Sequence, residues 1–145
     1  MSMEKINIII ADDNIEFGEL LKKYLSKYGY IKVLGVAQDG FEAVEMIKSF
    51  LPDIVILDII MPNLDGIGVL EKVPELGLKK KPLFIMLSAI GQDVFVQKAI
   101  DLGAEYYIVK PFSVDILAAR IKQIYNEKCI SPFSTANTVG KKPTF

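Results

Sequence analysis

The sequence predicts an α/β fold, a doubly wound, five-stranded parallel sheet with helices on both faces. Short apolar runs alternate five times with segments whose apolar residues recur at helical spacing. The central run, residues 54–57, is continuously apolar and lacks the alternation of a sheet face exposed to water, so it indicates a strand buried on both faces. Repeated strand-helix order implies parallel strands with right-handed crossovers, and 145 residues are too few for an eight-stranded α/β barrel.

The first strand-helix unit is predicted between residues 6 and 29. Residues 6–11 form an apolar strand that ends in two acidic residues, and Asn14 follows at a position suited to cap a helix. Gly29 then ends this helix. Its apolar residues form one stripe: Phe17, Leu20, Leu21, Tyr24, Leu25 and Tyr28.

The second unit begins with a strand at residues 31–37, and residues 38–40 form a turn. The helix that follows ends before Pro52, because the residue before a proline avoids helical backbone. The apolar residues of this helix are Ala43, Val44, Ile47, Phe50 and Leu51.

The third unit contains the central strand, residues 54–57, which is continuously apolar and ends abruptly in Asp58. Turn-forming residues at 61–66 lead the chain away from the sheet just after this aspartate. The apolar residues Val69, Leu70 and Val73 predict a third helix, which Pro74 and Gly77 end. A carboxylate at the end of a buried strand is costly without a partner, although Asp58 alone is also compatible with a helix cap.

The fourth and fifth strands, residues 83–87 and 106–109, end in Ser88 and Lys110. The fourth helix carries Phe95, Ala99 and Leu102 and ends at Gly103. Ser113 is placed to cap the fifth helix. The predicted inward residues of that helix are Ile116, Leu117, Ile121, Ile124 and Tyr125. The basic run at residues 79–81 is expected to be solvated.

Composition excludes several classes of function. The net charge of −1 and the pI of about 5.5 give no bulk electrostatic case for nucleic-acid binding. No apolar run is long enough to span a membrane, and no signal peptide is expected, so we predict a cytoplasmic protein without membrane contact. The single cysteine, Cys129, fits a reducing compartment. Without histidine, any metal must bind oxygen ligands, which suits Mg²⁺, Mn²⁺ or Ca²⁺.

Polar residues at the ends of four strands are expected to meet at one edge of the sheet. They are Asp12, Asp13, Asp58, Ser88 and Lys110. Three carboxylates in one cleft repel one another unless a divalent cation neutralises them. A lysine and a hydroxyl nearby add donors for a phosphoryl group. Together these residue types indicate phosphoryl transfer to a carboxylate.

This set of motifs resembles the receiver domain of bacterial two-component response regulators. The resemblance covers residues 5–126, and its motifs are Asp12-Asp13, Asp58 with Met61-Pro62 and Asp65-Gly66, Ser88-Ala89, and Lys110-Pro111. It implies a flavodoxin-like fold with strand order 2-1-3-4-5. It also implies phosphorylation of Asp58 by a phosphohistidine on a histidine kinase or histidine phosphotransferase.

The resemblance further implies a role for each site residue. Asp13, Asp58 and the backbone carbonyl of Ile60 would hold Mg²⁺, and Asp12 would bind it through water. Lys110 would contact the phosphoryl group. Ser88 would move to hydrogen-bond that group, and Tyr107 would swing inward behind Ser88.

Finer features resemble the receivers of stage-zero sporulation transcription regulators of endospore-forming Firmicutes. The segments are IIMPNLDGIGVLE, FIMLSAIGQ and KAIDLGAEYYIVKPF. Those regulators join the receiver through a linker to a DNA-binding domain. We expect residues 1–126 to form the receiver and residues 127–145 a linker or disordered tail. Because no helix-turn-helix pattern is present, contact with DNA would require an effector domain absent from this chain. Self-association on phosphorylation is expected.

Three alternatives remain open. The chain is also compatible with a stand-alone phosphoryl-transfer intermediate. A Mg²⁺-dependent phosphatase of the haloacid-dehalogenase type would need an acid-base Asp two residues after the nucleophile, where Ile60 stands, so we expect no enzyme and at most slow self-dephosphorylation. A flavodoxin-like cofactor binder would need a hydroxyl- and Gly-rich loop after the first strand, where Asp12-Asp13-Asn14 stands.

Overall fold

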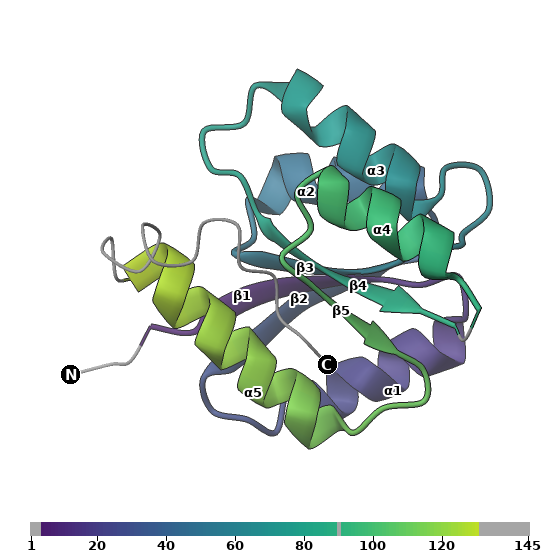
Figure 1. Ribbon diagram of the computed structural model, residues 1–145. Helices are drawn as coiled ribbons and strands as arrows, with labels where there is room; N and C mark the ends of the chain where they lie inside the picture. The colour runs from purple at the N-terminus through teal and green to yellow at the C-terminus, as the bar shows by residue number, and fades with distance from the viewer. Residues whose placement is uncertain (1–3, 90, 131–145) are drawn as a thin grey trace.

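The computed structural model describes residues 4–89 and 91–130. In this part of the chain, five parallel strands form one sheet in the order β2-β1-β3-β4-β5 (Figure 1). The strands are β1 (Ile6–Ala11), β2 (Ile31–Ala37), β3 (Ile54–Asp58), β4 (Leu83–Ser88) and β5 (Tyr106–Val109). The predicted fold class and strand order are confirmed.

The helices lie on both faces of the sheet. In Figure 1, α1 and α5 cover one face, and α2, α3 and α4 cover the other. Their bounds are α1 (Ile15–Leu25), α2 (Gly40–Phe50), α3 (Gly66–Lys72), α4 (Asp93–Asp101) and α5 (Val114–Tyr125). A 3₁₀ turn (Val73–Leu76) extends α3, and a π-helix (Asn126–Ile130) extends α5. None of the described helices is both long and apolar enough to cross a membrane.

The strands divide their side chains between two cores because successive residues point to opposite faces. On β3, Val55 and Leu57 join the core under α2, α3 and α4, whereas Ile54 and Ile56 join the core under α1 and α5. All four of these β3 residues have no exposed surface. This two-sided burial explains the continuously apolar strand sequences.

The predicted stripe of α1 is wrong in part. The helix ends at Leu25, with Ser26 as its C-cap, so Tyr28 lies beyond it. Leu20 and Tyr24 are 49% and 41% exposed. The reason is Gly18, where an added Cβ would lie 2.7 Å from a Val36 methyl group. This close approach turns the face that contains Gly18, Leu21 and Leu25 toward the sheet and leaves Leu20 and Tyr24 outside.

Other helices are rotated in the same manner. In α4, Val96 is buried and Phe95 is 45% exposed, and in α5, Ala118 is buried while Ile116, predicted inward, is 54% exposed. Phe50 of α2 is 49% exposed. When the apolar stripe of a helix is wider than its contact with the sheet, the residues along one side of the stripe stay exposed to solvent. The side of the stripe with smaller residues packs on the sheet, because small residues allow the helix to approach it more closely.

The ends of two predicted features also differ. Ser113 occupies the N-cap position of α5, but its side chain makes no capping hydrogen bond. Helical backbone continues through Ile130, so the first residues of the predicted linker, 127–130, are helical. The remainder of the predicted linker, residues 131–145, lies outside the described residues.

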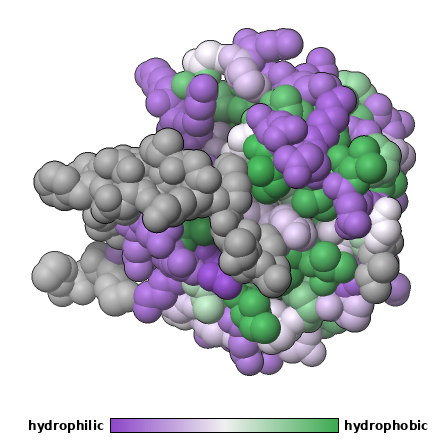
Figure 2. All heavy atoms as spheres, in the orientation of Figure 1, coloured by the Kyte–Doolittle hydropathy of each residue, from purple (hydrophilic) through white to green (hydrophobic). Residues whose placement is uncertain are grey.

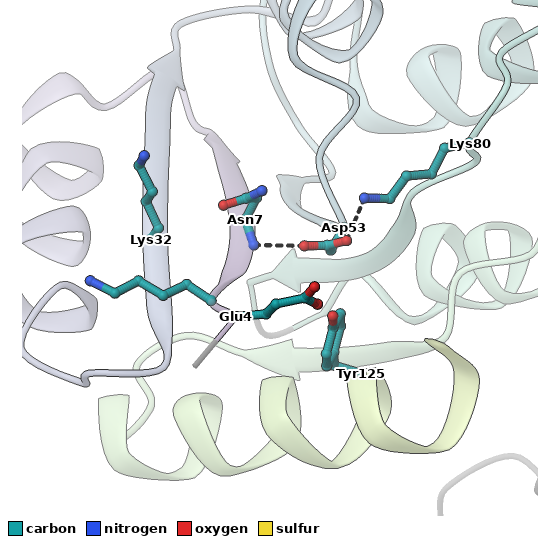
Figure 3. A pocket seen from close by; sticks show the side chains of 7 residues that line it. Glu4, Asn7, Lys32, Asp53, Lys80 and Tyr125 are labelled. Carbon is teal, nitrogen blue, oxygen red and sulfur yellow. Dashed lines mark hydrogen bonds and ion pairs between the residues drawn. The ribbon is translucent and has the colours of Figure 1, made fainter. Parts of the chain in front are cut away.

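A buried carboxylate just before β3 connects β1 to the loop before β4 at the amino-terminal edge of the sheet (Figure 3). Asp53 is 7% exposed. Its Oδ2 accepts a 2.8 Å hydrogen bond from the Asn7 backbone N–H, and its Oδ1 pairs with Lys80 Nζ at 2.5 Å. Lys80 therefore has a structural partner, contrary to the expectation of a wholly solvated basic run. These residues line a polar pocket of about 560 Å³ at the edge opposite the candidate site.

Candidate functional site

Three site residues lie on the same face of the sheet at its carboxyl-terminal edge, because side chains alternate between the two faces along each strand. Asp12 follows β1, Asp58 ends β3, and Lys110 follows β5. Each continues the register of residues that pack under α1 and α5, namely Ile8 and Ile10, Ile54 and Ile56, and Tyr106 and Ile108. Because the strands are parallel, these ends meet at one edge of the sheet.

The Lys110 ammonium links two buried carboxylates. Its Nζ lies 2.8 Å from Asp12 Oδ2 and 3.1 Å from Asp58 Oδ2. Asp12 has no exposed surface, and Asp58 is 8% exposed. The other oxygen of Asp12 accepts the Asn14 N–H at 2.9 Å, whereas Asp58 Oδ1 has a longer contact of 3.3 Å with the Ile60 N–H.

Asp13 completes an acidic cluster and is the exposed member of it. One carboxylate oxygen each from Asp12, Asp13 and Asp58 lies within 4.8 Å of the other two. Oxygens that share one Mg²⁺ ion, with bonds of about 2.1 Å, lie at most about 4.2 Å apart. The three carboxylates can therefore bind one Mg²⁺ ion if their oxygens move slightly closer together, or if a water molecule connects one of them to the ion. The donor chemistry fits as well, because the ligands are all carboxylate oxygens.

The electrostatics of the cluster favour a cation near Asp58. Burial, followed by the charge of Asp12, raises the pKa of Asp58 to about 6, even though Lys110 acts in the opposite direction. Burial alone would lower the pKa of Lys110, but the hydrogen bond to Asp12 and the charges of both carboxylates raise it overall. One ammonium therefore does not compensate the negative charge of this site.

The loop after β3 is packed tightly against Asp58. A Cβ added to Gly66 would lie 2.4 Å from the Asp58 backbone oxygen, and the Gly66 N–H donates to the Ile59 carbonyl at 2.8 Å. Asp65 caps α3 by accepting the Gly68 N–H at 2.8 Å. The motif Asp65-Gly66 thus turns the chain into α3 directly beneath the strand end. Ile60 is 46% exposed within this loop.

Ser88 and Tyr107 lie on the other side of the sheet from Lys110. Ser88 continues the face of Phe84 and Met86, and Tyr107 is the register partner of Met86. Ser88 is 1% exposed, and its Oγ has no hydrogen-bond partner in the described structure. Tyr107 is half-buried and packs against the core beneath α4. A buried hydroxyl without a partner is costly and calls for an explanation.

Sequence reasoning missed two contacts of the site. Asn63 has a left-handed backbone (φ 69°), and its side chain donates to Asp39 at 2.8 Å. The Pro62-Asn63 pair was an available signal, since asparagine tolerates this conformation in turns. The Phe17 ring lies 4.5 Å from Lys110 Nζ, and only its helical position was predicted.

Comparison with known proteins identifies the class. The family model of the response regulator receiver domain matches residues 8–122, and the chain belongs to this family. Receiver domains are generally phosphoacceptors rather than enzymes, and they take part in two-component signalling with histidine kinases. The cluster of Asp12, Asp13 and Asp58 is the acidic pocket of such a domain and is consistent with a divalent metal site.

Solved structures of receivers have the same architecture. The signal receiver domain of the response regulator NarL from Mycobacterium tuberculosis is 29% identical, with a TM-score of 0.79 over 87% of this chain and 100% of that chain. The receiver domain of Francisella response regulator 1452 is 30% identical, with a TM-score of 0.74 over 84% and 98%. A DNA-binding response regulator of the LuxR family from Staphylococcus aureus is 25% identical, with a TM-score of 0.76 over 83% and 99%.

Proposed function

We propose that Asp58 is the phosphoryl acceptor of a phosphoaspartate signalling switch. The observation that carries this proposal is the position of its carboxylate, at the end of the central strand between Asp12 and the Lys110 ammonium. Asp58 is accessible enough to react, at 8% exposure, while Asp12 is wholly buried and has both oxygens engaged. The family membership supports the same assignment.

In the proposed transfer, a carboxylate oxygen of Asp58 attacks the phosphorus of a partner's phosphohistidine. The new O–P bond forms as the P–N bond breaks, and the electron pair of that bond returns to the imidazole nitrogen. Lys110 stabilises negative charge on the transferred group because its ammonium already contacts Asp58. The reaction needs Asp58 ionised: without a bound cation the pKa of Asp58 is raised to about 6, and a bound cation would favour the ionised form.

Asp13, Asp58 and the Ile60 carbonyl are the proposed direct ligands of Mg²⁺, for which Mn²⁺ can substitute. Asp12 is assigned a ligand water rather than a direct bond, because Asn14 and Lys110 occupy its two oxygens. When bound, the ion neutralises the carboxylates and the developing charge on the phosphoryl oxygens. The exposed carboxylate of Asp13 leaves the cluster open to an entering ion.

The proposed response to phosphorylation begins at Ser88. A phosphoryl group on Asp58 supplies the acceptor that the Ser88 hydroxyl lacks. Movement of Ser88 frees space on the α4 side of the sheet, and Tyr107, which is on that side, fills it. This gives two alternative packings of the surface formed by α4 (Asp93–Asp101) and β5 (Tyr106–Val109), which we call the α4–β5 face.

Self-association through the α4–β5 face is the proposed output. Figure 2 shows hydrophobic residues among hydrophilic ones on the surface in this view. On the α4–β5 face, Val94 is 79% exposed and Phe95 45%, and Val109 at the end of β5 is 37% exposed. Apolar side chains of this size, grouped on one face, are typical of an interaction surface.

A histidine kinase or histidine phosphotransferase is the proposed phosphodonor. Ile15 and Leu20 of α1 are 50% and 49% exposed. Beside them an apolar groove of about 150 Å³ is lined by Phe17, Leu20, Leu21, Tyr24, Pro111, Phe112 and Val114. Phe17 and Pro111 lie next to Lys110, so a partner seated here would be close to Asp58.

The finer assignment is a cytoplasmic regulator of sporulation that controls transcription through a DNA-binding effector. Its support is the likeness of three sequence segments to sporulation regulators, in the loop after β3, in β4 and in the segment from α4 to β5. Transcription assays of a chain that includes an effector domain test it. A stand-alone phosphoryl-transfer intermediate remains the alternative, and it would pass its phosphoryl group to a second histidine protein.

The decisive experiment is intact mass measurement after incubation with acetyl phosphate, with and without Mg²⁺. We expect a gain of one phosphoryl group that depends on Mg²⁺ and is absent in Asp58→Asn, which keeps the size of the side chain but removes the nucleophile. Detection of the same adduct on Asp58→Asn would refute the assignment of Asp58 as the phosphoryl acceptor.

A further inference from the structure

We propose that Phe17 is a positioning residue for Lys110, and that the face of its ring holds the ammonium toward Asp58. This inference rests on the proposed function of Asp58 and Lys110. The Lys110 Nζ lies 4.5 Å from the centroid of the Phe17 ring. A cation at this distance from an aromatic ring is attracted by the negative charge density of the ring face.

Phe17 is held in place through both its backbone and its ring. The Phe17 backbone N–H donates to Asn14 Oδ1 at 3.0 Å, and the Asn14 backbone N–H donates to Asp12 Oδ1 at 2.9 Å. The Phe112 ring packs edge-to-face on Phe17, with centroids 6.1 Å apart and planes at 86°. The first turn of α1 is therefore connected to the same aspartate that pairs with Lys110.

Lys110 needs a support other than its carboxylates. Its side chain is 29% exposed, so it is partly open to solvent. Both of its ionic partners belong to the acidic cluster, and one of them, Asp58, changes charge and shape when it is phosphorylated. The ring of Phe17 does not change, so it keeps the ammonium at the site in both states. Attraction to the ring is strongest when the cation is partly desolvated, as here.

Phe17 also lines the apolar groove beside Lys110, and a simpler explanation is that its ring is only a wall of that groove. The two explanations differ in what the ring must provide. A groove wall needs apolar volume, which leucine supplies. A support for the ammonium needs an aromatic face, which leucine lacks and tyrosine keeps.

The test compares Phe17→Leu and Phe17→Tyr in the complete chain. The first readout is the NMR signal of the Lys110 side chain, whose protons are shifted upfield by a ring current when they lie over an aromatic face. We expect Phe17→Leu to lose this shift and Phe17→Tyr to keep it. Phe41→Leu, which alters a 51% exposed ring in α2, is the matched control and should leave the signal unchanged.

The second readout is the rate of phosphorylation by acetyl phosphate, a small donor that needs no docking surface. We expect Phe17→Leu to slow it about three- to tenfold and Phe17→Tyr to change it less than about twofold, in line with the strength of cation–π contacts. Thermal unfolding confirms that each variant is folded. If Phe17→Leu keeps the wild-type rate, or if Phe17→Tyr slows phosphorylation as much as Phe17→Leu does, the ring is only a groove wall and the proposal is overturned.

Discussion

The side-chain amide of Asn63 donates a 2.8 Å hydrogen bond to Oδ2 of Asp39, and so joins the loop after β3 to the start of α2. Oδ1 of the same aspartate caps α2 by accepting the Glu42 N–H at 2.8 Å. These two acceptor bonds lower the pKa of Asp39, the cap contributing most. The backbones also approach closely here, since a Cβ on Gly40 would lie 2.1 Å from the Leu64 carbonyl oxygen.

We predict that Asp39→Ser weakens Mg²⁺ binding. Serine keeps the helix cap but is too short to reach Asn63, so the loop that contains Ile60 loses one restraint. The dissociation constant for Mg²⁺ should rise about three- to tenfold, as expected for the loss of one hydrogen bond. Isothermal titration calorimetry measures it.

Asn63→Gly provides the matched control for that prediction. Glycine keeps the left-handed backbone but removes the amide, so it should weaken Mg²⁺ binding to a similar degree. Combined with Asp39→Ser it should add little, because both variants remove the same bond. Additive effects of the two substitutions would contradict the proposed link.

The raised pKa of Asp58 predicts a pH-dependent stability in the absence of divalent cations. The folded protein holds the Asp58 proton up to about pH 6, whereas an unfolded aspartate releases it near its ordinary value of 3.8. Stability from this group is therefore fully present below about pH 4 and is lost as pH rises through 6. We expect a loss of about 1–2 kcal/mol, because partial solvent access reduces the full effect.

Urea denaturation from pH 4 to pH 8 measures this dependence, with Asp58→Asn as the control because asparagine does not titrate. The difference between wild type and variant isolates Asp58 from the other carboxyl groups. Saturating Mg²⁺ should remove the loss at high pH, since the ion stabilises the ionised form. A difference between the two proteins that does not vary with pH would refute the role of burial.

Ser88→Ala is expected to separate stability from switching. Among the described residues the buried Ser88 hydroxyl has no hydrogen-bond partner, so its removal should leave the unphosphorylated protein unchanged or stabilise it by about 1 kcal/mol. The response to beryllofluoride with Mg²⁺, a mimic of the acyl phosphate, should be lost at Tyr107. Chemical shifts of the Tyr107 ring, recorded with and without the mimic, measure that response; an unchanged response in Ser88→Ala would contradict the coupling.

The α4–β5 face is expected to form a dimer when the site is loaded. Sedimentation of wild type with beryllofluoride and Mg²⁺ should show self-association, and Val94→Asp should abolish it by placing a charge at a 79% exposed position. Lys98→Glu and Gln97→Arg, which reverse or add charge on α4, should weaken it. Ile116→Asp, at an exposed position of α5, is the control for added charge. A loaded wild type that stays monomeric would exclude this interface.

Much of the architecture could be predicted from the sequence alone, because the patterns that indicate strands and helices lie within short stretches of the chain. A strand buried on both faces must be continuously apolar, and this signal is visible for the central strands β3 and β4 without any tertiary information. Parallel strands place all their carboxyl ends at one edge, so the approach of Asp12, Asp58 and Lys110 was predictable from their positions after the runs. The strand order came from the motif resemblance rather than from periodicity.

The tertiary structure alone decided which face each helix presents and which side chains meet across elements. Gly18 sets the rotation of α1 through its contact with Val36, and the apolar stripe is too wide to reveal that rotation. The pairs Asp39–Asn63 and Asp53–Lys80 join residues on different elements. Periodicity shows which face of an element is apolar, but contacts between side chains of different elements depend on the distance and rotation between those elements, and packing sets both. For the same reason the contact of Phe17 with Lys110 could not be predicted: the two residues are 93 positions apart along the chain, and Lys110 Nζ lies 4.5 Å from the Phe17 ring centroid.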